Sequence, residues 1–100
     1  MRYITLPTTL VLQAIADGVR HGFDITDHTG LQTGTVYPAL RRLETLGLVR
    51  SSWENEKAAR REQRPARRYY EITRDGRDAL DVALKRFENL ARLKPGPRHA

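Results

Sequence analysis

Cysteine is absent from the 100-residue sequence, which excludes disulfide bonds, zinc–thiolate sites and a cysteine nucleophile. Long hydrophobic runs are missing as well. The apolar stretch 10–16 is interrupted by Gln13 and is far too short to span a bilayer. The N-terminus also lacks the cleavage pattern of a signal peptide. We therefore expect a cytoplasmic protein without a membrane partner.

Recognisable catalytic and metal-binding patterns are lacking too. The sequence has no Ser-His-Asp arrangement, no glycine-rich phosphate loop and no paired carboxylates that define a cleft. Its histidines, His21, His28 and His99, form no ligand pair on one face, so a metal site is not expected. His21 is expected to form a hydrogen bond across the start of a helix instead. From these absences we expect that the protein is not an enzyme and binds no cofactor.

Positive charge, by contrast, is abundant. The 18 Lys and Arg residues exceed the 12 Asp and Glu residues, which gives a net charge of +6 and a pI of about 10.3. This excess favours a polyanionic partner, either nucleic acid or an anionic membrane surface, over the simpler alternative of solubilising charge. A chain this short forms one domain with a limited core, and such chains often gain stability by oligomerisation.

Helical periodicity dominates the first half of the chain. The apolar spacing predicts a buried helix over 6–16, ended by Asp17-Gly18. A second helix of about two turns follows Gly22 and stops at Thr29-Gly30. A third runs from hydroxyl caps in the segment 33–35 to about Leu46. Two short helices joined by a tight link at 30–32 are the outline of a helix-turn-helix.

The third predicted helix has an apolar face and a basic, aromatic outer face. Val36, Leu40 and Leu43 fall on the core side, opposite Tyr37 and Arg41. A major groove accepts one α-helix, and arginine there can bind guanine through two hydrogen bonds. The alternative is an ordinary amphipathic helix with a solvated arginine face. The candidate DNA contacts on this segment are Thr33, Gly34, Thr35, Tyr37, Pro38, Arg41 and Arg42. Pro38 is expected in the first turn, where a missing N–H costs little.

A β-hairpin is predicted next, from extended runs at 48–54 and 67–73. Trp53 and Tyr70 could stack on bases, but alternation places both on inner strand faces, which favours core packing. The polar segment 55–66 is expected to be a long, mobile loop. A basic hairpin after a helix-turn-helix has the layout of a wing, although the alternative is a charged flexible loop. Its candidate DNA contacts are Lys57, Arg60, Arg61, Arg64 and Arg67.

The last predicted helix covers 74–93 and is capped by Thr73. Its apolar stripe is long for so small a protein, and a second copy of the chain would bury it. The alternative is that the helix only closes the monomer's own core. The candidate dimer-interface residues are Leu80, Ala83, Leu84, Phe87, Leu90 and Ala91. We expect a DNA-binding region over 1–73, a dimerisation helix over 74–93 and a disordered tail over 94–100.

Four motifs resemble one known family. They are HGFDI at 21–25, GTVYPALRRLETLGLV at 34–49, WE at 53–54 and RRYYEITRDG at 67–76. Together they resemble the PadR family of winged-helix transcriptional regulators, in its short form with one C-terminal helix. The family commonly carries Gly-Arg-Pro in the wing, whereas this sequence has Gln63 before Arg64-Pro65.

The resemblance implies a homodimeric repressor that binds an inverted-repeat operator and contacts DNA through Tyr37 and the neighbouring hydroxyl and basic positions. It also implies that a small aromatic effector releases some members from DNA. The predicted fold is mainly α with a small β-hairpin wing. Two other functions stay open: a protein-interaction adaptor on the same scaffold, and a non-specific nucleic-acid or membrane-surface binder driven by net charge.

Overall fold

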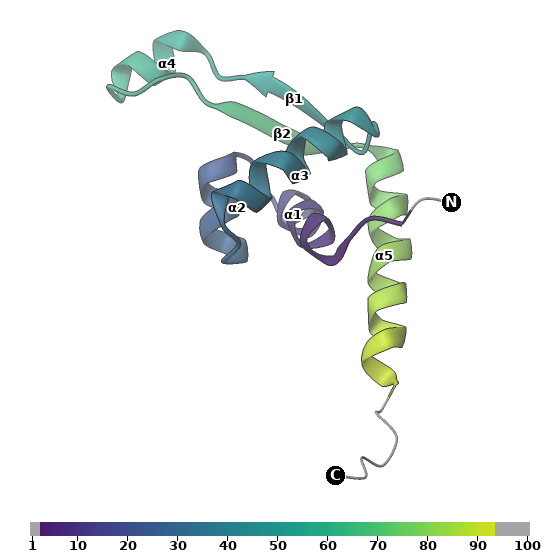
Figure 1. Ribbon diagram of the computed structural model, residues 1–100. Coiled ribbons are helices and arrows are strands. Elements are labelled where there is room, and N and C mark those ends of the chain that lie inside the picture. The colour runs from purple at the N-terminus through teal and green to yellow at the C-terminus, as the bar shows by residue number, and fades with distance from the viewer. Residues whose placement is uncertain (1–2, 94–100) are drawn as a thin grey trace.

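A computed structural model describes residues 3–93 (Figure 1). The elements follow in the order α1 (Leu6–Ala16), α2 (Gly22–Thr29), α3 (Thr33–Thr45), β1 (Val49–Trp53), α4 (Glu56–Arg61), β2 (Arg68–Ile72) and α5 (Arg74–Arg92). The predicted helix-turn-helix, hairpin and last helix are therefore confirmed. The predicted tail at 94–100 lies outside the described residues. Within 3–93, no helix is long and apolar enough to cross a membrane.

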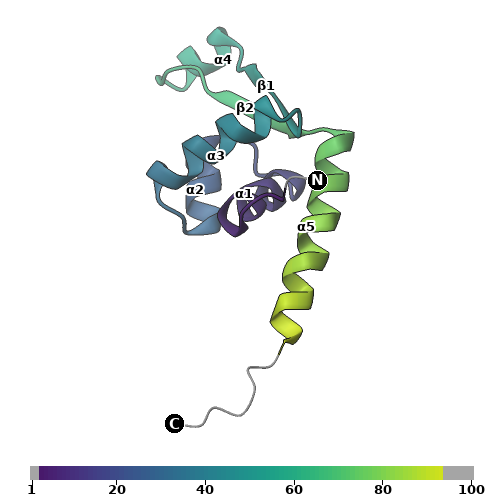
Figure 2. The ribbon, with the colours of Figure 1, turned by 45° about the vertical axis from the view of Figure 1, so that its right-hand side comes forward.

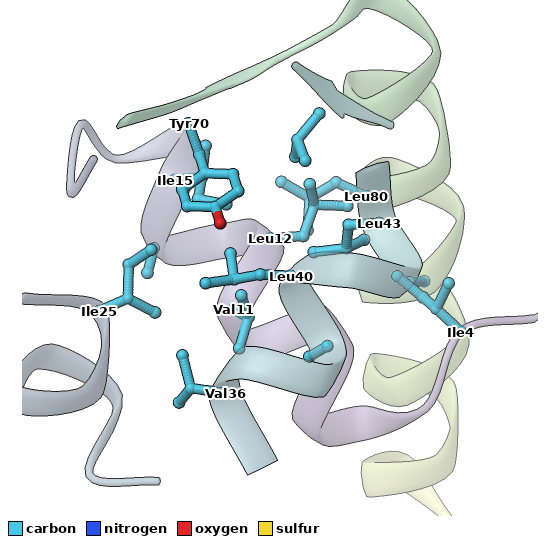
Figure 3. Packing of buried hydrophobic residues seen from close by; sticks show 14 residues of the cluster. Ile4, Val11, Leu12, Ile15, Ile25, Val36, Leu40, Leu43, Tyr70 and Leu80 are labelled. Carbon is cyan, nitrogen blue, oxygen red and sulfur yellow. The ribbon is translucent and has the colours of Figure 1, made fainter. Parts of the chain in front are cut away.

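Helix α1 lies at the centre of the fold and contacts α2, α3, α5 and β2. The Thr5 side chain accepts a hydrogen bond from the Thr8 N–H and caps the helix. Leu12 and Ile25 pack with Leu40 and Leu43 in the core, and all four side chains are fully buried (Figure 3). Burial of these side chains holds the helix-turn-helix together and leaves the opposite side of α3 exposed.

The two strands pair antiparallel, from Val49 opposite Ile72 to Trp53 opposite Arg68. The free edge of β2 is also engaged, because the Tyr70 N–H donates to the Arg20 carbonyl at 2.8 Å. Next to it, His21 forms an isolated bridge with Tyr69. Since His21 is also the N-cap residue of α2, these contacts fix the hairpin to the helix-turn-helix.

Helix α5 begins against the turn that joins α3 to β1. The Thr73 N–H donates to the Leu48 carbonyl at 3.0 Å, and the Thr73 hydroxyl donates to the Gly47 carbonyl at 2.7 Å. The same hydroxyl oxygen accepts the Gly76 N–H at 3.0 Å and caps the helix, as predicted. These bonds fix the direction in which α5 leaves the body.

Helix α5 packs on the body only as far as Phe87. Leu80 and Ala83 are buried, and Phe87 is half-buried against the core. Beyond them the helix extends past α1, as both ribbon views show (Figure 2). Leu90 and Ala91 are exposed on this projecting part, and Leu84 is exposed on the packed part. The predicted interface residues therefore divide into a group that closes the monomer core and a group left uncovered.

Three local predictions about α3 and Trp53 are wrong. Helix α3 begins at Thr33 with Gln32 as its N-cap residue, and no side chain caps it. Pro38 therefore lies inside the helix, beyond the first turn. Its missing N–H leaves the Gly34 carbonyl without an intrahelical partner, but Gly34 is exposed, so water can satisfy that oxygen. Trp53 is not in the core, because its side chain is 66% exposed, whereas Tyr70 is buried as predicted.

The segment predicted to be an irregular loop contains helix α4. The Asn55 side chain accepts a hydrogen bond from the Lys57 N–H at 2.8 Å and caps this helix. Glu56 lies in its first turn and Arg60 and Arg61 in its last, an order that matches the helix dipole. Six residues are too few to show helical periodicity, which is why sequence patterning missed the element.

Candidate nucleic-acid interface

The outer face of α3 carries the first candidate surface. Tyr37 is 44% exposed, and Arg41 lies one turn further along the same face. Arg42 and Pro38 are exposed beside them. At the N-terminal end, Thr33 and Gly34 are exposed and Thr35 is half-exposed. All seven predicted positions on this segment therefore belong to one helix, and its apolar side is held in the core.

Tyr37 is held in place by a close approach to α2. Gly22 is buried at the start of that helix. A Cβ added there would lie 2.7 Å from the Tyr37 hydroxyl oxygen and 2.8 Å from Cζ. Only glycine leaves room for the ring in this position, so Gly22 sets the direction of Tyr37. The glycine of the HGFDI motif is thus part of the site's geometry, a role that the sequence did not reveal.

The far end of the wing carries a second cationic group. Lys57, Arg60 and Arg61 are all exposed on α4. Arg60 is 3.7 Å from Glu56 in a surface pair, and such exposed pairs hold a cation only weakly. No ion pair within residues 3–93 involves Lys57 or Arg61. These side chains are accessible to an anionic partner.

Arg64 and Glu54 fix the base of the wing. The Arg64 guanidinium donates to both carboxylate oxygens of Glu54, at 2.6 and 2.7 Å. The Tyr69 hydroxyl and the Arg67 N–H donate to the same carboxylate. The Glu54 side chain is 9% exposed and that of Arg64 is 20% exposed. Together, the bonds from Arg64, Tyr69 and Arg67 outweigh burial and lower the Glu54 pKa to about 2.

Glu54 is expected to make the wing's stability depend on pH. Its pKa falls from about 4.5 to about 2 on folding, so the carboxylate stabilises the fold above about pH 4.5. This stabilisation is lost as the pH falls toward 2. Glu54→Gln should therefore lower the melting temperature at pH 7, and the difference from wild type should shrink as the pH falls through this range. This difference in melting temperature can be measured by monitoring thermal unfolding through tryptophan emission. A constant difference across that range would contradict the assignment.

Gln63 occupies a backbone conformation that favours glycine. Its φ is 56°, and it follows the end of α4. A residue with a Cβ costs about 1 kcal/mol in this region. Gln63→Gly should relieve that strain and, after the added freedom of the unfolded chain is subtracted, stabilise the protein by about 0.5 kcal/mol. Chemical denaturation provides the measurement, with Gln63→Ala as the matched control that keeps the Cβ. Equal gains from both variants would show that the strain is not the cause.

Arg67 and His21 meet where the wing joins the helix-turn-helix. Arg67 Nη1 lies 3.2 Å from His21 Nε2. His21 Nε2 is also 2.8 Å from an Asp24 carboxylate oxygen. The Tyr69 ring meets the imidazole edge-on at 5.8 Å between centroids. The His21–Asp24 distance spans the start of α2, where a hydrogen bond of His21 was predicted. Arg67 is half-exposed and faces this junction rather than the wing tip.

Arg68 joins the hairpin to α3. Its Nη2 lies 3.0 Å from a carboxylate oxygen of Glu44, and its Nε donates to the Ser51 hydroxyl oxygen at 2.9 Å. The Ser51 hydroxyl in turn donates to Glu44. This bond, followed by the contact with Arg68, lowers the Glu44 pKa. Sequence spacing did not reveal this group, because its three members come from separate elements.

The arrangement defines a class of protein. Helices α2 and α3 with the β1–β2 hairpin form a winged helix-turn-helix, and its exposed surface on α3 and the wing is rich in arginine. Among residues 3–93, no group of three His, Asp or Glu side chains can hold a metal ion. Residues 11–82 match the sequence model of the transcriptional regulator PadR-like family. The chain belongs to this family. Its members are DNA-binding transcription regulators and not enzymes.

Solved structures share this fold. A PadR family transcription regulator from Clostridium difficile is 23% identical, with a TM-score of 0.76 over 89% of this chain and 94% of that one. A PadR family regulator from Eggerthella lenta is 26% identical, with a TM-score of 0.64 over 83% and 75%. Bordetella bronchiseptica BpsR, whose DNA binding is regulated by 6-hydroxynicotinic acid, is 23% identical, with a TM-score of 0.72 over 96% and 68%. No curated protein matches the sequence.

Proposed function

We propose that the protein is a repressor that binds an inverted-repeat operator as a homodimer in the cytoplasm. The observation that carries this proposal is the continuous exposure of Tyr37, Arg41 and Arg42 on a helix whose other side is locked in the core. Such a helix fits the major groove. A repressor then acts by occupying DNA that transcription requires.

In this proposal α3 and the wing contact different parts of the DNA. Tyr37 and Arg41 face base edges, and the hydroxyls and amides at the start of α3 bind phosphates. Lys57, Arg60 and Arg61 bind the flanking backbone or the minor groove. Arg64 keeps the wing folded through its bonds to Glu54, and Arg67 supports the junction with α2. Both arginines contribute to DNA binding mainly by positioning the wing.

The uncovered part of α5 is proposed as the dimer interface. Leu84 and Leu90 of α5 are exposed, and so are Leu6 and Leu10 of α1, which packs beside it. A two-fold partner would bury all four apolar side chains. The same symmetry would present two α3 helices to half-sites about one helical turn apart.

Charged substitutions in this stripe are expected to produce monomers. The double variant Leu84→Glu with Leu90→Glu places two carboxylates where the proposed partner packs, and burying an unpaired charge is unfavourable. Sedimentation should show a monomer for this variant and a dimer for the wild type. The control is Asn89→Glu, which adds one carboxylate at an exposed position on the other side of α5. A variant that still sediments as a dimer would contradict this interface.

A small aromatic effector is the remaining part of the proposal. A cavity of about 330 Å³ lies between the N-terminal segment, the end of α3 and the first half of α5. Its wall is mostly apolar and includes Tyr3, Leu46 and Val82, while Asp75 and Asp78 lie among its lining residues. The carboxylates disfavour an anionic ligand, so the effector expected here is a neutral or cationic aromatic compound. It would act by changing how α5 sits against α3.

Salt dependence of binding tests the proposal. We would measure anisotropy of a labelled operator duplex, obtained by selection from random sequences, at several salt concentrations. The logarithm of affinity should fall linearly with the logarithm of salt. Removing one phosphate-binding cation, as in Arg61→Ala, should flatten that slope by about one unit. Salt-insensitive binding would contradict the proposal and favour an adaptor.

A further inference from the structure

Two wing residues remain outside the surfaces assigned above. Trp53 ends β1, and Arg68 lies directly opposite it at the start of β2. The indole is 66% exposed, and the guanidinium carbon of Arg68 lies 5.5 Å from its ring centroid. Other large apolar side chains are also exposed, so exposure alone does not mark Trp53 as a binding residue; its place on the hairpin and the adjoining guanidinium do. It is also the only tryptophan in the sequence.

The strand geometry places this pair on the side of the hairpin that faces α3. Trp53 alternates with Ser51 and the buried Val49 on one face of β1. Ser51 donates to Glu44 of α3, so this face is the one that meets the helix. Beyond Trp53 the chain continues into α4, away from the helical body (Figure 1). Trp53 therefore lies past the point where α3 covers the hairpin, which explains its exposure.

Arg68 is held in one orientation with one edge available. Its Nε and Nη2 contact Ser51, and Nη2 also contacts Glu44. Glu44 follows Tyr37 and Arg41 on the same helix face, at i, i+4 and i+7 spacing. Within residues 3–93, no hydrogen bond uses Arg68 Nη1. A planar guanidinium fixed along one edge is suited to donate from the other.

We propose that Trp53 and Arg68 together bind one sugar–phosphate step of the duplex that α3 enters. The indole packs against the deoxyribose, and Arg68 Nη1 donates to the adjoining phosphate. This inference rests on the proposed DNA-binding function and adds a contact between the two surfaces already described. Because Glu44 already compensates part of the Arg68 charge, the pair sets the register of the duplex more than it adds bulk attraction.

The surrounding charge favours DNA over a protein partner. The pair lies between the arginines of α3 and the exposed cations Lys57, Arg60 and Arg61 of α4. A partner that covers Trp53 must also approach these cations, and a polyanionic backbone gains from that approach. An apolar protein surface would have to desolvate them without compensation.

The single tryptophan makes the contact directly measurable. We would titrate the full-length protein with the selected operator duplex, following duplex anisotropy for binding and acrylamide quenching of Trp53 emission for contact. The proposal expects quenching to decrease as the complex forms. Trp53→Ala should weaken operator binding about tenfold, while Trp53→Phe keeps a ring and most of the affinity. Arg68→Ala should weaken binding more than Arg50→Ala, which removes the same charge from the outer strand face.

The outcomes separate the inference from the function on which it rests. Duplex binding with unchanged quenching of Trp53 would overturn this contact and leave the DNA-binding proposal standing. Absence of any duplex binding would overturn both. Quenching that is already weak without DNA, and that depends on protein concentration, would overturn the contact in favour of a protein interface.

Discussion

Gly76→Ala is expected to lower the free energy of unfolding by about 3 kcal/mol or more. A Cβ at this position would lie 2.0 Å from the Leu48 carbonyl oxygen and 2.8 Å from Cγ1 of Ile72. The Leu48 oxygen belongs to the backbone, so it cannot move away by a change of rotamer as a side chain can. Relief would require α5 to move away from the turn between α3 and β1, which would break the Thr73 bonds that anchor it.

Thermal unfolding provides the measurement. For a domain of this size, that loss corresponds to a decrease in the melting temperature of about 15 °C. The matched control is Gly34→Ala, another helical glycine replaced by alanine, at which an added Cβ meets no atom within 4 Å. The control should unfold within about 1 kcal/mol of the wild type. If both variants unfold alike, close packing at Gly76 does not anchor α5.

Arg41→Ala and Tyr37→Ala are expected to cause the largest losses of specific DNA binding. A side chain that reads a base contributes about 1–3 kcal/mol of discrimination, so each variant should lose about five- to 150-fold in operator affinity. Its affinity for a scrambled duplex should change far less. A residue that grips only phosphate would lower both affinities together and flatten the salt slope. The comparison therefore decides whether Tyr37, Arg41 and Arg42 each read bases or bind the backbone.

Gly22→Ala supplies an independent control on Tyr37. The added methyl group would displace the tyrosine ring, whose outer end can move, so folding should be affected little. Operator binding should fall in the same direction as in Tyr37→Ala. Combining Gly22→Ala with Tyr37→Ala should add little further loss, because both act through one contact. Full additivity of the two losses, or unchanged binding by Tyr37→Ala and Arg41→Ala, would contradict the assignment of α3.

Periodicity made the long elements predictable from sequence. Helices α1, α3 and α5 carry apolar residues at steps of three and four, and their positions agree with the structure to within about two residues. The paired strands were found by alternation in the same way. Alternation also assigned Trp53 correctly to the face that meets α3. It cannot show how far a strand extends beyond the body, and for that reason the residue was wrongly placed in the core.

Contacts between residues far apart in the chain could not be predicted from the sequence. In the sequence, Glu54 and Arg64 cannot be distinguished from two ordinary surface charges. They come together only because α4 folds between them. The DNA contact of Arg64 stays a prediction, whereas its bond to Glu54 depends on a partner that the sequence does not identify. Asn55 followed by Glu56, with arginines at 60 and 61, was a readable helix signal for α4. The division into a DNA-binding region and a dimerisation helix stays a prediction.

Selection of bound duplexes from a random pool tests the central claim most directly. A dimer that reads DNA through two α3 helices should enrich an inverted repeat whose half-sites lie about one helical turn apart. The double variant Leu84→Glu with Leu90→Glu should lose that enrichment. If the wild-type protein enriches no sequence, its basic surface binds nucleic acid through charge alone, and the proposal of an operator-directed repressor is contradicted.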